Sequence, residues 1–225
     1  MEIQGQFLWG SNYTFLVRVS KREESLLAVY KPAAGERPLW DFDHASLGRR
    51  EVATYRLSTA LGWPSVPPTL LREGPHGPGS VQLFIDADHE EHFFSLRDRG
   101  SFEEFFQQIV LFDFVINNAD RKGGHSLLGN DGRIWSIDHG LTFHTEDKLR
   151  TVIWDYAGLP IPHRMLDDLE ALRKKLASEL PLGGQLADLI TPAEIEALIA
   201  RIDHLLDSGT FPLPGLGRNV PYPLV

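Results

Sequence analysis

Cysteine is absent from all 225 residues of this chain. Its absence excludes disulfide bonds, catalysis by a thiolate and zinc sites built on cysteine. Long apolar runs are absent too, so the sequence offers no candidate transmembrane segment. Residues 1–5 lack the basic start and the apolar stretch of a signal peptide. Together these absences lead us to expect a cytoplasmic protein.

Positive charge is in short supply: 22 Lys and Arg stand against 31 Asp and Glu, a formal net charge of −9. This balance argues against non-specific binding of nucleic acid, because phosphate contacts need a positive face. It still permits an anionic ligand in a locally positive pocket. With 42% hydrophobic and 24% charged residues, the chain has the composition of a globular protein. Its length suits one large domain or two lobes that share a cleft.

The N-terminal part has the pattern of a small sheet. Residues 7–19 are apolar and aromatic at both ends, with Gly10, Ser11 and Asn12 between them, which predicts a strand, a tight turn and a strand. Such a turn exposes backbone N–H groups that suit a phosphate, although similar turns are common in hairpins without a ligand. Residues 26–31 are predicted to form another strand, which ends on Lys31.

A helix is predicted at residues 47–61 from the helical spacing of its apolar side chains. Glu51 has two interpretations: an acid that suits the positive end of the helix dipole, or a buried partner of Lys31. Residues 69–72 and 80–85 are predicted to form a strand pair joined by a long, Gly- and Pro-rich turn.

Acidic residues 86–92 are our candidate boundary between two lobes, at residues 1–88 and 89–225. His89 and His92 flank two glutamates there, one residue short of the i, i+4 histidine pair of a zinc helix. We therefore interpret this segment as a solvated connector rather than a zinc site.

The C-terminal part is predicted to be mainly helical. Ser101 and Glu104 form a capping box for a helix that is apolar nearly all round up to residue 116, which predicts burial. Later helices are predicted around residues 166–176 and from Thr191 to Gly209, followed by an extended tail at 211–225. Residues 154–156, Trp-Asp-Tyr, are assigned either to core packing or to contact with a substrate.

Two aspartates, Asp120 and Asp138, flank a short segment whose turn signal is Gly-Asn-Asp-Gly at residues 129–132. This tetrad between apolar runs predicts a tight hairpin, so we expect both carboxylates to face one pocket. Neighbouring carboxylates repel each other unless a metal ion or a proton lies between them. One interpretation is a base and a magnesium ligand for phosphoryl transfer; the other is a pair of turn-capping aspartates.

In order, the predicted features are a Gly-containing turn, a strand-end lysine, a helix with a glutamate, a linker, a buried helix, an aspartate, a hairpin and an Asp-x-Gly motif. This order resembles the protein-kinase-like fold, most closely its atypical branch of phosphatidylinositol 3- and 4-kinases, HipA-type bacterial kinases and small bacterial relatives. Residues 120–122 match the first two positions of the Asp-Arg-His motif of phosphoinositide kinases. Residues 138–140 keep the outer residues of Asp-Phe-Gly, and Val-Tyr-Lys at 29–31 resembles the strand that ends in the nucleotide lysine. The resemblance extends to about Phe143.

The resemblance implies an α+β, two-lobed fold: a small N-terminal antiparallel sheet lobe with one helix and a mainly helical C-terminal lobe. It implies ATP as cofactor, with Mg²⁺ or Mn²⁺. Lys31 would neutralise phosphates, Glu51 would orient it, and the turn at Gly10, Ser11 and Asn12 would cover the phosphates. The backbone near Phe84 and Ile85 would hold adenine. Asp120 would accept or orient the acceptor hydroxyl, and Asp138 would bind the metal.

One departure from the family concerns His125, which takes the position five residues after Asp120 where this fold usually has a metal-binding Asn. Imidazole is a softer ligand than a carbonyl oxygen and matches magnesium less well. Either Asp138 holds one metal alone, or His125 has another role, or manganese is preferred. Lys122 replaces the His of the Asp-Arg-His motif. It could supply positive charge near the γ-phosphate, or Arg121 and Lys122 could only balance the local acids.

Three functions follow from this pattern. The first is an ATP-dependent phosphotransferase that acts on a hydroxyl of a protein or a small molecule. The second is a pseudokinase or nucleotide-binding regulatory module, and the third is an adenylyl transferase on the same fold. No basic membrane-facing patch is evident, which weakens the lipid-kinase interpretation.

Overall fold

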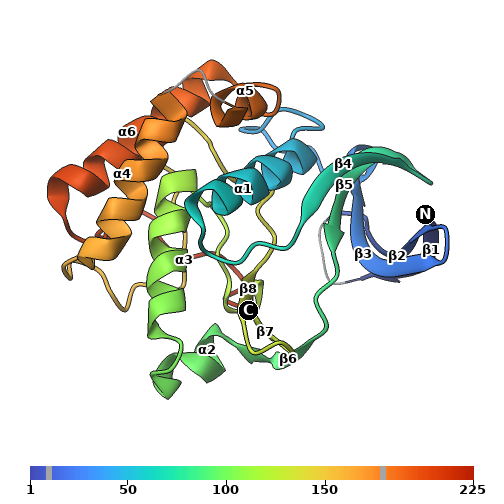
Figure 1. The fold of residues 1–225 in the computed structure, drawn as a ribbon, viewed down its shortest axis with the longest axis horizontal. Coiled ribbons are helices and arrows are strands. Elements are labelled where there is room, and N and C mark those ends of the chain that lie inside the picture. Colours follow the sequence, from blue (N-terminus) through green and yellow to red (C-terminus); the bar gives the residue numbers. More distant parts are fainter. Residues whose placement is uncertain (9–11, 178–180) are drawn as a thin grey trace.

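A five-stranded antiparallel sheet forms one side of the molecule and a group of helices forms the other (Figure 1). The computed structural model describes residues 1–8, 12–177 and 181–225. The sheet has the order β1-β2-β3-β5-β4. Its strands are β1 (Glu2–Phe7), β2 (Thr14–Lys21), β3 (Glu24–Pro32), β4 (Thr69–Gly74) and β5 (Gly77–Leu83). A short 3₁₀ turn, η1 (Ala33–Gly35), follows β3.

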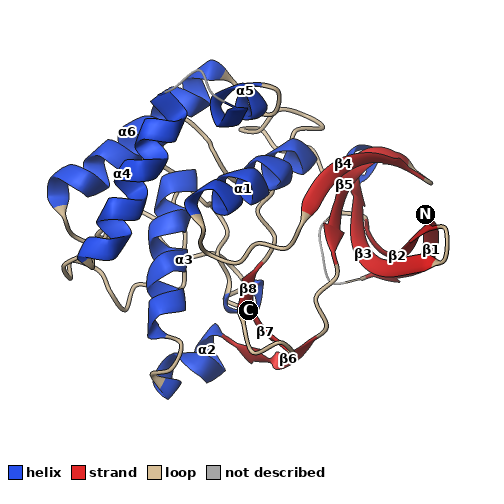
Figure 2. Ribbon diagram, viewed as in Figure 1, coloured by secondary structure: helices blue, strands red, loops and turns tan. Residues whose placement is uncertain are grey.

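Helix α1 (Leu47–Leu61) connects the sheet to the helices (Figure 2). It ends, as predicted, at Gly62, whose φ of 92° is a left-handed conformation suited to glycine. Its buried side chains, among them Val52 and Leu57, pack into the large core of the helical lobe. The one helix inserted in the sheet lobe is therefore held against the other lobe.

A second, three-stranded sheet has the order β6-β7-β8. Its strands are β6 (Ala87–His92), β7 (Ser126–Gly129) and β8 (Ile134–Ser136), and β7 and β8 form the predicted hairpin. Residues 86–92 were expected to be a solvated connector. The segment is largely exposed, as expected, but most of it forms the strand β6, which pairs with β7, and the expected lobe boundary at residue 88 falls inside this strand.

The helical lobe contains α2 (Phe93–Leu96), α3 (Glu103–Ile116), α4 (His163–Ala177), α5 (Pro181–Ala187) and α6 (Pro192–Ser208), with 3₁₀ turns η2 (Arg97–Arg99) and η3 (Gly123–His125). Helix α3 is buried along most of its length, as its apolar composition predicted. The capping box of Thr191 and Glu194 at α6 is confirmed, and so is Gly209 at its C-terminal cap. None of the described helices is long and apolar enough to cross a membrane.

Two local predictions were wrong at element ends. Ser101 does not cap α3: the N-cap is Phe102, because Gly100 adopts a φ of 62° and begins a turn that delays the helix by one residue. The Gly- and Pro-rich stretch at 74–79 is not a long turn either, since strands β4 and β5 pair up to Gly74 and Gly77.

Close packing explains two of the three glycines of that stretch, Gly74 and Gly79. A Cβ atom at Gly79 would lie 2.3 Å from the carbonyl oxygen of Lys31, and one at Gly74 would lie 2.6 Å from the ring of Tyr30. These glycines let β5 and β4 approach the strand that carries Lys31. The expected α+β arrangement, an antiparallel sheet lobe and a mainly helical lobe, is confirmed.

Candidate active site

A cleft of about 420 Å³ lies between the two lobes and brings together residues from distant parts of the chain. Its lining includes all the predicted site residues that the structure describes: Asn12, Lys31, Glu51, Phe84, Ile85, Asp120, Lys122, His125 and Asp138. Gly10 and Ser11 lie outside the described residues. The sheet lobe supplies the first five of these side chains or backbones, and the helical lobe supplies the rest.

Lys31 is the link between the lobes. It lies near the end of β3, where Nζ donates hydrogen bonds to Oε1 of Glu51 on α1 and, over 2.8 Å, to Oδ1 of Asp138. The second oxygen of Glu51 accepts a hydrogen bond of 3.0 Å from Ser80 on β5. Both Glu51 oxygens are thus occupied, so this buried carboxylate holds Lys31 in a fixed direction.

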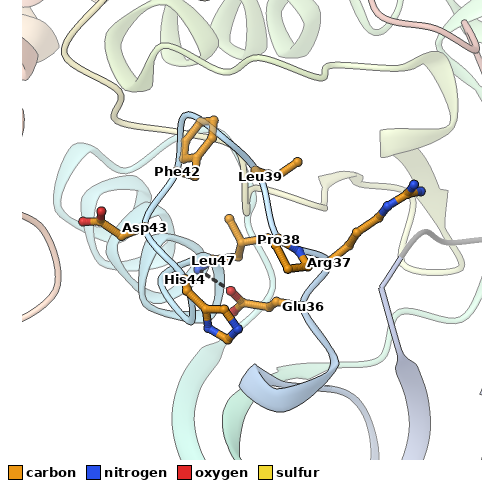
Figure 3. A pocket seen from close by; sticks show the side chains of 8 residues that line it. All are labelled: Glu36, Arg37, Pro38, Leu39, Phe42, Asp43, His44 and Leu47. Atoms are coloured by element: carbon orange, nitrogen blue, oxygen red, sulfur yellow. Dashed lines mark hydrogen bonds between the residues drawn. The ribbon is translucent and has the colours of Figure 1, made fainter.

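The acid at the start of α1 is Glu36 rather than Glu51. The first turn of α1, which is described in full, contains no acidic residue. Figure 3 shows Glu36 in the preceding loop, with its carboxylate directed at Leu47. The two oxygens of Glu36 accept the N–H groups of Leu47 and Gly48 at 3.4 and 3.2 Å. The dipole interpretation of Glu51 is therefore wrong, because a loop residue caps this helix.

Lys31 and Asp138 change each other's pKa. Burial alone would lower the pKa of Lys31, but the charges of Asp138 and Glu51 outweigh it and hold the pKa above its ordinary value. The positive charge of Lys31 in turn holds the pKa of Asp138 well below its usual range. Asp138 is thus an anion at neutral pH, which suits a metal ligand.

The pKa of Asp120 is shifted in the opposite direction from that of Asp138. Burial raises its pKa to about 6; Lys122 lowers it and the charge of Asp138 raises it. Lys122 Nζ lies 3.4 Å from Oδ2 of Asp120, and the backbone N–H of Asp120 donates to Asn118 Oδ1 over 3.1 Å. A carboxylate with a pKa near the operating pH can accept a proton in the reaction and release it afterwards.

His125 ends the turn η3 and lies beside Asp138, with Nε2 3.4 Å from Oδ2. Burial lowers the pKa of His125 to about 4, so the ring is neutral at neutral pH. Within the described part of the chain, its Nδ1 atom is buried and has no hydrogen-bond partner. A neutral imidazole beside a carboxylate is a reasonable ligand pair for a divalent cation.

The protein donors alone do not complete a metal site. Among the described residues, no group of three or more His, Asp or Glu side chains is arranged to hold an ion. Magnesium bound with a nucleotide typically takes one or two protein ligands and completes its shell with phosphates and water. Asp138 and His125 fit this kind of site, since both line the cleft.

The backbone at residues 84–85 connects the two lobes at the inner end of the cleft. The N–H of Phe84 donates to the carbonyl of Leu27 over 3.1 Å and continues the sheet, so it is not available to a base. Within the described residues, the carbonyl of Phe84 and the N–H of Ile85 have no such partner. These two groups belong to one trans peptide and point in opposite directions, so only one of them can face a given ligand.

Residues 154–156 lie away from this cleft. The indole N–H of Trp154 donates to the carbonyl of Asn219 over 3.1 Å, and the ring of Tyr156 packs 5.6 Å from that of Phe211. None of the three belongs to the described lining of the cleft. The packing interpretation therefore holds for these aromatic residues, which anchor the C-terminal segment.

Three functional candidates were missed in the sequence: Asp113, Arg121 as a buried group, and His139. Arg121 and Asp113 are fully buried and paired, with Nε of Arg121 2.7 Å from Oδ2 of Asp113. His139 lies 2.8 Å from Nη2 of Arg121. Asp113, the one acid in the otherwise apolar stretch at residues 109–116, was an available signal, because a buried charge needs a partner.

Comparisons with known proteins place this geometry in context. No protein-family model matches the chain. Protein Rv2133c of Mycobacterium tuberculosis is 39% identical to it over 99% of this chain and 91% of that protein.

Among solved structures, the proinflammatory kinase CtkA of Helicobacter pylori aligns with a TM-score of 0.56 at 13% identity, over 93% of each chain. Hydra Fam20, solved with a sugar, aligns with a TM-score of 0.53 at 13% identity, over 92% of this chain and 84% of that one. These likenesses confirm the protein-kinase-like fold. The narrower placement beside the phosphatidylinositol 3- and 4-kinases is not confirmed and stays a prediction. The chain belongs to the family of the mycobacterial Protein Rv2133c and has the protein-kinase-like fold.

Proposed function

We propose that this protein is an ATP-dependent phosphotransferase that acts on a hydroxyl of a protein or a small molecule. The observation that carries the proposal is the convergence of Lys31, Asp120 and Asp138 on one cleft between the lobes. Kinase folds use these residue types for the nucleotide phosphates, the acceptor hydroxyl and the metal. The structural similarity to the kinase CtkA supports the fold on which this proposal depends.

The backbone near Phe84 and Ile85 would bind the adenine, and Lys31 would contact the phosphates. Asp138, which pairs with Lys31 in this structure, would exchange that partner for the metal ion. Mg²⁺ or Mn²⁺ would supply charge neutralisation at the phosphates, with Asp138 and His125 as its protein ligands. Most of the rate would come from positioning and electrostatics, because no covalent enzyme intermediate is needed.

In the transfer step, the acceptor oxygen forms a bond to the γ-phosphorus while the bond from that phosphorus to the β–γ bridging oxygen breaks. The acceptor hydroxyl gives its proton to the carboxylate of Asp120, and ADP leaves with the bridging oxygen. A pKa of about 6 keeps most of Asp120 ionised at pH 7. Lys122, at 3.4 Å from Asp120, would hold positive charge next to the transferred group.

Incubation with ATP labelled at the γ-phosphate tests the proposal. We expect label on the protein itself or on an acceptor from a cell extract, and its loss in Asp120→Asn but not in the control Asp98→Asn. Label from the α-phosphate would instead mean adenylyl transfer. ATP binding without transfer of either label would favour a pseudokinase, an alternative supported by His125 at the usual Asn position. No transfer and no ATP binding would overturn the proposal.

A further inference from the structure

Arg121 has the largest side chain among the fully buried residues that the structure describes. A guanidinium carries five N–H groups in a fixed planar fork and remains charged at any ordinary pH. Such a group is rarely buried without complete pairing, because desolvation of an unpaired charge is very unfavourable. Its contacts therefore show what the fold uses it for.

All five N–H groups of Arg121 have an acceptor. Nε and Nη2 bind the two carboxylate oxygens of Asp113 at 2.7 and 2.9 Å. Nη1 donates to the backbone carbonyls of His125 at 3.0 Å and Ile137 at 3.2 Å. The remaining N–H of Nη2 lies 2.8 Å from Nε2 of His139. Since arginine can only donate, Nε2 of His139 must be the acceptor, and the ring proton belongs on Nδ1.

These acceptors belong to three different segments. Asp113 lies on α3, His125 closes η3, and Ile137 with His139 flanks Asp138 on both sides. One carbonyl that Nη1 binds belongs to His125, a candidate metal ligand. The other belongs to Ile137, the residue before Asp138, which is the second candidate ligand. A structural ion pair with Asp113 would need only two of the five donors. The other three are directed at the backbone and the side chain that position the candidate ligands.

Asp120, the proposed base, is connected to the same buried ion pair of Arg121 and Asp113. Asp113 Oδ1 also accepts a hydrogen bond from Asn118 Nδ2 at 2.8 Å, and Asn118 Oδ1 accepts the N–H of Asp120. The backbone of Arg121 is itself held on both sides, by Arg150 at 2.9 Å and Val152 at 3.1 Å. One buried cation thus connects the segment of the base with both segments of the metal ligands.

We propose that Arg121 is a positioning residue that sets the separation between Asp120, His125 and Asp138 and so determines the affinity of the cleft for metal-bound nucleotide. This inference rests on the proposed function. Lysine cannot replace arginine in this role, because an ammonium is a point charge without the planar fork that reaches several acceptors at once. Loss of the fork would free both ligand-bearing loops while leaving the adenine end of the cleft unchanged.

Calorimetric titration of Arg121→Lys tests this role. The variant keeps a positive charge opposite Asp113, and its fold is checked by circular dichroism. We expect the Kd for ATP with Mn²⁺ to rise roughly 10-fold or more, the range seen when groups that support metal ligands are changed. The Kd for ATP in the presence of a chelator should stay within about twofold of wild type, since adenine contacts are untouched. Arg173→Lys, in a partly exposed ion pair with Asp203 outside the cleft lining, is the matched control.

His139 offers a second test if Arg121→Lys does not fold. His139→Gln keeps a side-chain acceptor for Nη2, whereas His139→Leu removes it. We expect weaker binding of ATP with Mn²⁺ in the leucine variant and substantial rescue in the glutamine variant. A purely structural role for Arg121 would lower the melting temperature of these variants without changing the ratio of the two Kd values. That unchanged ratio would overturn the inference, whereas a wild-type protein with no metal-dependent binding would overturn the proposed function as well.

Discussion

Replacement of Asp120 by asparagine should stabilise the folded protein while it removes the proposed activity. The cause is the raised pKa of Asp120, which burial moves from an ordinary 3.8 to about 6. A carboxylate whose pKa is raised on folding is less favourable when ionised in the folded state than in the unfolded state. The neutral amide of Asn has nearly the same shape and does not have this penalty.

The size of this gain in the free energy of unfolding follows from the pKa shift of Asp120. Roughly two pKa units correspond to about 3 kcal/mol at about 1.36 kcal/mol per unit. The side chain of Asp120 is 27% exposed, and solvent screening reduces the expected gain to roughly 2 kcal/mol. For a chain of this length, that gain raises the melting temperature by about 4–8 °C.

The stability gained in Asp120→Asn should be larger at higher pH. Between about pH 4 and pH 6 the folded wild type binds more protons at Asp120 than the unfolded chain does, so its stability falls as the pH rises through this window. The variant does not titrate at this position. The stability difference is therefore fully present above about pH 6 and absent below about pH 4.

Thermal unfolding of both proteins between pH 4 and pH 8 measures this difference. Asp98→Asn is the control, because its side chain is 87% exposed and its replacement should change stability by less than about 0.5 kcal/mol. An Asp120→Asn protein that is folded but no more stable than wild type at pH 7.5 would refute the reasoning. A gain that persists unchanged at pH 4 would refute it too.

Three further variants test the role of Lys122, the buried pair of Arg50 and Glu194, and the close packing at Gly79. Lys122→Met should move the acidic limb of the pH–rate profile for phosphoryl transfer upward by roughly one unit, because Lys122 lowers the pKa of Asp120. Glu194→Ala should destabilise the protein by about 3–5 kcal/mol in denaturant unfolding, because it leaves the buried Arg50 without its 2.6 Å partner and removes the Glu194 half of the capping box of α6. Gly79→Ala should weaken both stability and ATP binding in a thermal-shift titration, because its Cβ would collide with the backbone of β3 that carries Lys31.

Matched controls separate these effects from general sensitivity to mutation. Asp203→Ala removes a partly exposed ion pair with Arg173 and should cost no more than about 1 kcal/mol. Gly5→Ala has nothing within 4 Å of the new Cβ and should leave the melting temperature nearly unchanged. A Glu194→Ala protein as stable as Asp203→Ala would contradict the assignment of Arg50–Glu194 as a buried pair. If the acidic limb of the pH–rate profile of Lys122→Met lies at the same pH as in the wild type, the role given to Lys122 is contradicted.

Much of the fold was predictable because its signals are local. The left-handed cap at Gly62, the capping box at Thr191 and the turn at residues 129–132 each depend on neighbours in the sequence. The order of a strand-end lysine, a helical glutamate and two aspartates then identified the fold, and the structure places all four residues in one cleft.

The rest depended on contacts between distant segments. Strand β6 has no apolar alternation and exists because its backbone pairs with β7, which lies more than 30 residues later. The glycines at 74–79 have the composition of a loop, but Gly74 and Gly79 reflect close approach to residues of β3. The role of Arg121 could not be read from its neighbours, since its acceptors come from α3, η3 and the loop around Asp138.

Binding of a metal-bound nucleotide between Lys31 and the two aspartates is the central claim. A crystal structure with Mn²⁺ and a non-hydrolysable ATP analogue, with anomalous diffraction from manganese, tests it most directly. We predict an anomalous peak within about 2.6 Å of an Asp138 carboxylate oxygen. We also predict that Lys31 moves from Asp138 to the phosphates. A peak remote from Asp138, with the Lys31–Asp138 ion pair intact and no nucleotide in the cleft, would contradict the account.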